Sequence, residues 1–190
     1  MRMPEIFRKL SRGPQIVTLK DAGIIAAYTG LSPGDLVVDA GSGSGFLAIF
    51  MGNIVRPEGR VVSYEVREDF SKIAARNVKK AGLEKYVEVK KRDIFKGIGE
   101  KDVDVITLDM PEPWHAIDHA FAALKKGGYL VSYLPTTEQM SRFVRACRNK
   151  GLKHERSVEC IVREMDVKET GTRPETKGIM HTAYLSFFRK

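Results

Sequence analysis

The sequence has 190 residues, of which 43% are hydrophobic and 29% are charged. This length suits one domain with a sizeable core and excludes two domains of ordinary size, and the composition excludes an intrinsically disordered chain. Lys and Arg number 32 against 24 Asp and Glu, and the resulting net charge of +8 favours a polyanionic partner such as nucleic acid. Because no apolar run reaches the ~18 residues that a membrane span needs, we expect no membrane association and a cytoplasmic protein.

Metal binding and disulfide bonding are not expected from the cysteines and histidines. Cys147 and Cys160 match no zinc or disulfide spacing, so they are expected to be reduced thiols. His115 and His119 lie four residues apart, but no third ligand or H-E-x-x-H pattern accompanies them. We therefore expect no metal.

Strand-like and helix-like segments alternate along the chain. Residues 1–13 are interpreted as an N-terminal arm and residues 14–190 as one domain. The expected helices span residues 20–30, 46–55, 67–82, 112–125 and 137–150. The expected strands span residues 36–40, 60–65, 86–91, 103–108, 128–134, 153–165 and 180–189. This alternation indicates an α/β fold with helices on both faces of a mostly parallel, seven-stranded sheet, whose last strand is antiparallel because no helix precedes it.

A glycine loop follows the first strand. Gly41-Ser42-Gly43-Ser44-Gly45 lies between Asp39-Ala40 and an apolar helix that begins at Phe46. Glycines allow the backbone to approach a ligand closely. Because Phe46 stands where a dinucleotide fingerprint has its third glycine or alanine, NAD is less well supported than S-adenosylmethionine, which carries no phosphate.

The second strand ends in an acidic residue. Glu65 lies twenty residues past Gly45, where a carboxylate can accept hydrogen bonds from both hydroxyls of a ribose. A glycine loop alone is weak evidence, and it could be a plain strand-to-helix turn. Together with Glu65 and Asp109 it predicts a cofactor site.

The fourth strand carries Asp109 into a turn with prolines at positions 111 and 113, followed by Trp114, the single tryptophan. Ligands of open α/β sheets lie beyond the carboxyl ends of the strands, and the prolines fix the backbone there. A carboxylate and exposed carbonyls can bind the exocyclic amine of a nucleobase while an aromatic ring covers its face. Alternatively, Asp109 only caps the helix that follows.

The last two strands are separated by a polar loop, residues 169–178, that could reach toward a substrate. Arg163, Lys168, Arg173 and Lys177 lie in or beside it. Among the histidines, His181 on the last strand is favoured as a residue of the site. The alternative is that it is a core histidine.

These motifs resemble those of the S-adenosylmethionine-dependent tRNA (adenine-N1) methyltransferases, which modify a T-loop adenine at position 57 or 58. The resemblance runs from about Arg12 to the C-terminus. It rests on Arg12-Gly13-Pro14-Gln15 with Lys20-Asp21, the loop at 39–45, the turn at 109–114, and Arg173-Pro174-Glu175 with His181-Thr182. It implies a Rossmann-like class I methyltransferase domain and a homotetramer. Family members usually carry a small N-terminal β-domain, and this chain is expected to lack it.

The resemblance also implies roles for individual residues. Asp109, Tyr133 and His181 are expected to be catalytic, with Asp109 engaging the target adenine, although Tyr133 could also be a plain core tyrosine. The residues expected to bind S-adenosylmethionine are Asp39, Gly41, Ser42, Gly43, Ser44, Gly45, Glu65, Val66, Asp93, Ile94 and Asp109. Those expected to bind tRNA are Gln15, Trp114 and Arg173.

Two other functions remain open at this point. The chain could methylate a small molecule or a protein on the same fold, although Trp114, the basic tail and Arg173-Pro174-Glu175 argue against this. It could also be a non-catalytic RNA-binding subunit that has lost the cofactor. Such a subunit need not retain Asp39, the glycine loop, Glu65 and Asp109 together.

Overall fold

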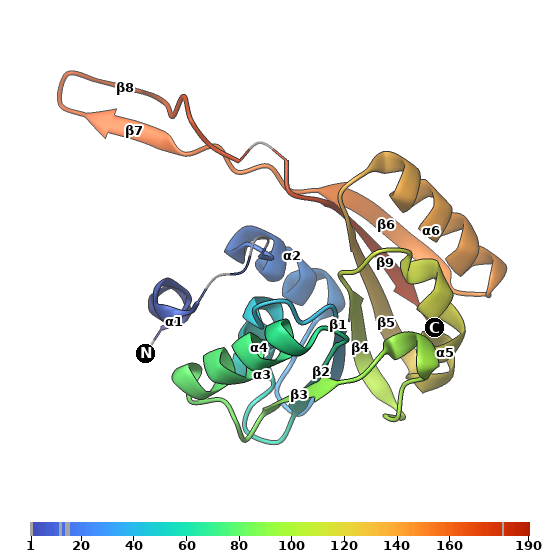
Figure 1. Ribbon diagram of the computed structural model, residues 1–190. Helices are drawn as coiled ribbons and strands as arrows, with labels where there is room; N and C mark the ends of the chain where they lie inside the picture. Colours follow the sequence, from blue (N-terminus) through green and yellow to red (C-terminus); the bar gives the residue numbers. More distant parts are fainter. Residues whose placement is uncertain (1, 12, 14–15, 180) are drawn as a thin grey trace.

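The computed structural model describes residues 2–11, 13, 16–179 and 181–190, and Figure 1 shows helices packed around a central sheet. The helices are α1 (Met3–Lys9), α2 (Leu19–Thr29), α3 (Phe46–Val55), α4 (Glu68–Ala81), α5 (Ile117–Ala123) and α6 (Thr137–Asn149), with 3-10 turns η1 (Ile94–Lys96) and η2 (Pro113–Ala116). The strands are β1 (Leu36–Ala40), β2 (Arg60–Glu65), β3 (Val87–Lys91), β4 (Val103–Leu108), β5 (Leu124–Leu134), β6 (Lys153–Glu159), β7 (Met165–Lys168), β8 (Gly171–Pro174) and β9 (Tyr184–Arg189).

The main sheet has seven strands in the order β3-β2-β1-β4-β5-β9-β6. Strands β1 to β5 pair in parallel, and β9 lies antiparallel between β5 and β6. This confirms the predicted mostly parallel sheet with an antiparallel last strand. The chain builds outward from β1 to β3 and then returns to the other side of β1, so a crevice opens where β1 and β4 end.

The core consists of two apolar clusters, because successive residues of a strand face opposite sides of the sheet. Val37 of β1 packs with α1, α2 and α3 in one cluster, whereas Val38 packs with α5 and α6 in the other. Ile25 of α2 and Phe143 of α6 are among the largest fully buried side chains. Both faces of the parallel strands are therefore covered, which explains their nearly continuous apolar sequence.

The predicted N-terminal arm contains a packed helix. Ile6 and Phe7 of α1 are buried, and the Phe7 ring meets the Phe46 ring edge to face at 4.8 Å between centroids. The segment thus extends the first core cluster. No helix in the described part of the chain is long and apolar enough to cross a membrane.

The largest departures from the predicted boundaries lie in the C-terminal half of the chain. The strand expected at 153–165 ends at Glu159, and residues 165–174 form a separate hairpin, β7–β8, which extends away from the domain (Figure 1). From here on, the arm means residues 160–183 near the C-terminus, and the N-terminal segment is referred to by its helix, α1. The helix expected at 112–125 begins as a 3-10 turn and ends at Ala123, because Leu124 already pairs with Val103 of β4 before an irregularity in the ladder.

Candidate active site

The carboxyl ends of β1, β2 and β4 place three acidic side chains at one edge of the sheet. Asp39 lies in register with Ser63 of β2 and Thr107 of β4. Glu65 ends β2, and Asp109 directly follows β4, where its backbone N–H donates to the Ala40 carbonyl at 2.8 Å. Parallel pairing alone therefore brings residues 39, 65 and 109 to the same crevice.

Asp39 is held by its two neighbouring strands. One carboxylate oxygen accepts from the Ser63 hydroxyl at 2.6 Å and the other from the Thr107 hydroxyl at 2.7 Å. The residue is 2% exposed, and this burial raises the pKa of Asp39, although the two hydroxyl donors act in the opposite direction. Asp39 is thus fixed in one orientation at the end of β1.

The glycine loop brings two backbone segments into contact. Gly41 has φ 91°, and a Cβ at this position would lie 1.8 Å from the carbonyl oxygen of Asp109. Only glycine fits both the conformation and the space. The hydroxyls of Ser42 and Ser44 are engaged within the protein, with Ser63 and with the Gly13 backbone, so the loop is held from beneath.

Glu65 joins the glycine loop to the start of α4. Its carboxylate accepts from the backbone N–H of Gly43 and of Arg67, each at 3.0 Å, and from Arg67 Nε at 3.4 Å. The Arg67 guanidinium also lies 3.8 Å from the centroid of the Phe70 ring. Glu65 is 4% exposed, so its carboxylate is preorganised by donors from two loops.

Two cavities meet at Asp109. The first, which we call the Glu65 cavity, has a volume of about 390 Å³ and is also lined by Val66, Asp93, Ile94 and Phe95. The second, the Tyr133 cavity, has a volume of about 310 Å³. The walls common to both are Gly41, Arg67, Asp109, Met110 and Pro111. Ligands in the two cavities would therefore lie next to each other beside the Asp109 turn.

The environment of Asp109 makes its charged form less favourable than that of an exposed aspartate. Burial raises the pKa of Asp109 to about 7, and the negative charges of Asp39 and Glu65 add to the shift. The turn that follows carries a strained residue, because Glu112 adopts φ 54° and ψ 47° just before Pro113. A carboxyl group with a pKa near 7 can lose its proton when a neighbouring ligand becomes cationic, and it can take up a proton that the ligand releases.

The far side of the Glu65 cavity suits a flat ring. The Asp93 carboxylate caps η1 by accepting from the Phe95 N–H at 2.9 Å. Val66 and Phe95 are exposed and Ile94 is buried, so apolar surfaces flank the carboxylate. The predicted cofactor residues 65, 66, 93 and 94 all line this one cavity.

Tyr133 and His181 lie at different depths. Tyr133 is buried, and its hydroxyl donates to Asp21 at 3.3 Å. His181 is exposed and lines a neighbouring cavity of about 580 Å³ that Tyr133 shares. Its ring nitrogens face Glu159 at 2.5 Å and the Pro135 carbonyl at 2.8 Å, contacts that raise the pKa of His181. Both ring nitrogens therefore face acceptors, and His181 connects the end of β6 with the residue that follows β5.

Two of the three predicted RNA-binding residues, Trp114 and Arg173, do not line the Tyr133 cavity. The Trp114 ring packs in the second core cluster under Arg142, whose guanidinium lies 3.8 Å from the ring centroid. Arg173 lies on β8 of the arm, with its Nε 3.7 Å from Asp166. Gln15 lies outside the described residues. The face of Trp114 is thus already covered, because the turn directs it toward α6.

Several residues that line the Tyr133 cavity were missed at the sequence level. They are Arg67, Phe70 and Gln139. They come from the start of α4 and from α6, and nothing in their local sequence marks a site. Their only shared signal is proximity to the ends of elements, which becomes useful once the sheet order is known.

The chemistry of the cavities favours an organic cation. Three carboxylates converge on this edge in a chain whose net charge is +8, so the site is locally acidic on a basic protein. Among the described residues, no group of three or more His, Cys, Asp or Glu side chains is arranged to hold a metal ion.

Comparison with known proteins gives one consistent group. Residues 2–183 match the family described as tRNA methyltransferase complex GCD14 subunit. The chain is 35% identical to the tRNA (adenine(57)-N(1)/adenine(58)-N(1))-methyltransferase TrmI of Methanocaldococcus jannaschii, over 98% of this chain and 76% of that protein.

Two solved structures share the fold along nearly the whole chain. The tRNA (m1A58) methyltransferase TrmI of Aquifex aeolicus superposes with a TM-score of 0.89 at 28% identity, covering 100% of this chain and 76% of that one. A SAM-dependent O-methyltransferase of Thermotoga maritima superposes with a TM-score of 0.89 at 36% identity, covering 99% and 70%.

Proposed function

Because the chain belongs to the tRNA methyltransferase complex GCD14 subunit family, we propose that it transfers a methyl group from S-adenosylmethionine to N1 of an adenine at position 57 or 58 of tRNA. The observation that carries this proposal is the meeting of two cavities at Asp109. A methyl transfer needs the two ligands in line and in direct contact, and the two cavities share their lining at the Asp109 turn.

The residues of the Glu65 cavity fit S-adenosylmethionine. Glu65 can accept from the ribose hydroxyls, and Asp93 can accept from the adenine amine between Val66 and Ile94. Asp39 and the glycine loop border a small space that also reaches Asp109, where the methionine end would lie. When bound, this ligand supplies an electrophilic methyl group on a sulfonium, and its positive charge suits the acidic edge of the sheet.

Asp109 is proposed to act on the target base from the Tyr133 cavity. Methylation of N1 leaves a positive charge on the adenine ring. The Asp109 carboxylate can stabilise that charge through a hydrogen bond from the exocyclic amine, and with a pKa of about 7 it can also take up the amine proton. Because N1 lies on the pairing edge of adenine, the base must leave its stack to reach the cavity.

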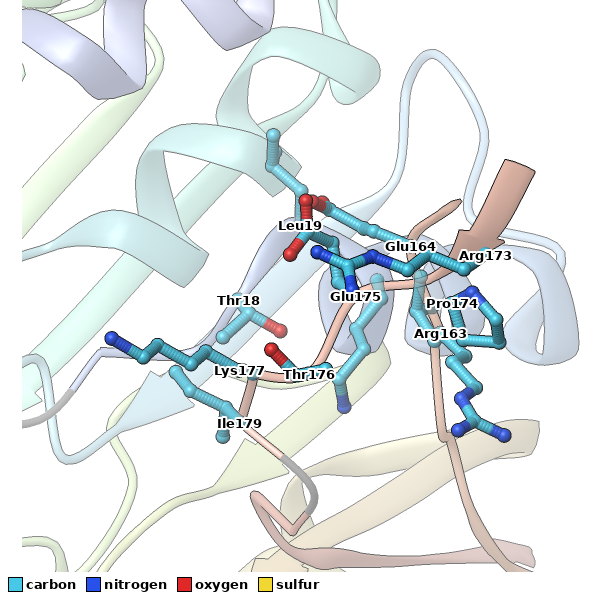
Figure 2. A pocket seen from close by; sticks show the side chains of 13 residues that line it. Thr18, Leu19, Arg163, Glu164, Arg173, Pro174, Glu175, Thr176, Lys177 and Ile179 are labelled. Carbon is cyan, nitrogen blue, oxygen red and sulfur yellow. The ribbon is translucent and has the colours of Figure 1, made fainter. Parts of the chain in front are cut away.

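The net charge of +8 supports tRNA as the partner, since cationic side chains bind phosphates without reading sequence. The arm contributes Arg163, Lys168, Arg173 and Lys177. A cavity of about 860 Å³ lies where the arm leaves the domain, and Figure 2 shows Thr18 and Leu19 on one side of it and Arg163 and Arg173 on the other.

We also propose that the chain forms a homo-oligomer through the arm. An isolated two-stranded hairpin is marginal in water. The arm nevertheless carries large exposed apolar side chains, namely Ile161, Val162, Met165, Val167 and Ile179. A second copy that covers them would stabilise the hairpin, and the homotetramer that the family resemblance implies gives the expected size.

The decisive test of function uses labelled S-adenosylmethionine with unmodified tRNA, followed by mass spectrometry of the nucleosides. We expect N1-methyladenosine as the product, and none from a tRNA whose adenines at 57 and 58 are replaced. As a matched control, Asp104→Asn removes a partly buried carboxylate that pairs with Lys125 at the opposite end of β4, and it should leave turnover unchanged. Label that enters protein or a small molecule but no RNA would overturn the proposal.

A further inference from the structure

An ion pair lies under the Tyr133 cavity, in the first turn of α2. Lys20 Nζ lies 2.8 Å from Asp21 Oδ1, and the Asp21 side chain is fully buried. A buried ion pair contributes little to stability compared with apolar residues of the same size. Because the neighbouring positions of α2 belong to the apolar core, this pair requires an explanation other than packing.

The second oxygen of Asp21 determines the direction of the Tyr133 hydroxyl. Asp21 Oδ2 accepts from Tyr133 at 3.3 Å and from the Thr18 hydroxyl at 2.9 Å. A tyrosine hydroxyl has one hydrogen, so when it points to Asp21 the oxygen offers only lone pairs to the cavity. Burial and the nearby Asp21 charge also raise the pKa of Tyr133, so the hydroxyl keeps its proton at neutral pH.

The Lys20 ammonium connects this arrangement to the arm. Besides Asp21, it donates to the Cys160 carbonyl at 2.6 Å and to the Thr182 hydroxyl at 2.8 Å. Cys160 directly follows β6, and Thr182 lies two residues before β9, so these are the two roots of the arm. An ammonium has three hydrogens, and all three are used here.

We propose that Lys20 and Asp21 are positioning residues, which hold the Tyr133 hydroxyl as a hydrogen-bond acceptor facing the Tyr133 cavity and fix it relative to both roots of the arm. This inference rests on the proposed function. Tyr133 and Asp109 line the same cavity, so together they present two acceptors to an incoming base. The exocyclic amine of adenine has two hydrogens to donate, whereas a 6-oxo purine offers none at that position.

The test is a double-mutant cycle between Asp21→Asn and Tyr133→Phe. The asparagine amide can donate to the tyrosine oxygen, which would turn the Tyr133 hydrogen toward the cavity. We expect Asp21→Asn to lower kcat about tenfold, with the Kd for S-adenosylmethionine within about twofold of wild type. In the Tyr133→Phe background the same change should lower kcat less than about twofold, because the hydroxyl it positions is already gone.

A purely structural role predicts another pattern. If Asp21→Asn keeps wild-type kcat, or lowers kcat by the same factor in both backgrounds, the positioning role is overturned. Asp104→Asn, which also breaks an ion pair with a lysine, is the matched control for general destabilisation and should lower the unfolding midpoint without changing kcat.

A second variant covers the case in which Asp21→Asn does not fold. Lys20→Met combined with Asp21→Asn removes both charges, so no lone charge stays buried. We expect the same tenfold loss of kcat from it, and wild-type kcat would overturn the inference. Failure of the wild-type protein to methylate tRNA would instead overturn the proposed function, so the two failures are distinguishable.

Discussion

The edge of the sheet and the arm differ in how far their side chains are buried and held by other residues of the chain. At the edge, Asp39 is 2% exposed and both of its oxygens are held by hydroxyls from adjacent strands. On the arm, Val167 is 74% exposed, and its strand pairs only with β8. The edge of the sheet is thus preorganised within one chain, whereas the arm extends from the domain with large apolar side chains exposed.

Substitutions in the two regions should therefore affect different parts of the function. Substitutions at the sheet edge should change catalysis or cofactor binding without changing assembly. Substitutions on the arm should change assembly while the domain stays folded.

The largest effect that would break this comparison is expected at Asp109. Asp109→Asn keeps the shape of the turn but removes the charge, which matters most as the adenine becomes cationic. We expect kcat to fall by roughly 100-fold or more while the Kd for S-adenosylmethionine stays within about threefold. Single-turnover methylation beside calorimetry measures both. Near wild-type turnover would reduce Asp109 to a helix cap, and a matched loss of affinity would assign it to the cofactor alone.

A smaller effect is expected at Glu65 and should appear in binding. Glu65→Ala removes a preorganised acceptor for the ribose, which should weaken S-adenosylmethionine binding by about 1–3 kcal/mol. Calorimetric titration checks this. The matched control is Glu68→Ala, three residues along the chain, where an exposed carboxylate pairs with Lys72 and Lys91. Equal loss of affinity in both variants would contradict a specific role for Glu65.

The pH dependence of turnover sharpens the same point. The pKa of Asp109 is raised to about 7, so the active carboxylate form is lost as the pH falls through that value. We expect kcat to decrease about tenfold per pH unit below 7 and to level off above 8. The Asp109→Asn variant has no group to titrate there, so its residual rate should stay flat. A wild-type profile without this limb would argue against a charged Asp109 in the rate-limiting step.

The smallest effect on the domain is expected from the arm. Val167→Lys places a charge on the exposed apolar surface and should shift the molar mass in solution toward the monomer, as light scattering can show. The unfolding free energy of the domain should change by less than about 0.5 kcal/mol. Glu84→Lys, at an exposed site before β3, is the control for an added lysine. An unchanged molar mass in Val167→Lys would contradict assembly through the arm.

The sheet and its acidic edge were predictable because they follow from local patterns. Apolar runs ending in Asp39, Glu65 and Asp109 mark parallel strands, and such strands end at the same edge. The structure confirms the fold and brings these three residues together. Their individual roles, and those of Tyr133 and His181, stay predictions.

The arm and the support of Tyr133 were not predictable. Cys160, Ile161 and Val162 are strand formers that directly follow β6, so the point where the chain leaves the sheet has no local signal. The Tyr133 hydroxyl bonds to a residue 112 positions away, and such pairings depend on how α2 packs against α3 and β9. The direction of the Trp114 ring was not predictable for a similar reason, because it is set by a contact with Arg142 of α6.

The contact between Gly41 and the Asp109 carbonyl has a consequence for tolerance to change. Because no side chain separates the two turns, their spacing is set by main chain alone, and it cannot drift as surrounding side chains vary. The alignment of methyl donor and acceptor is therefore insulated from most substitutions elsewhere in the molecule. For the same reason residue 41 tolerates no side chain, since even one added methyl group would push the two halves of the site apart.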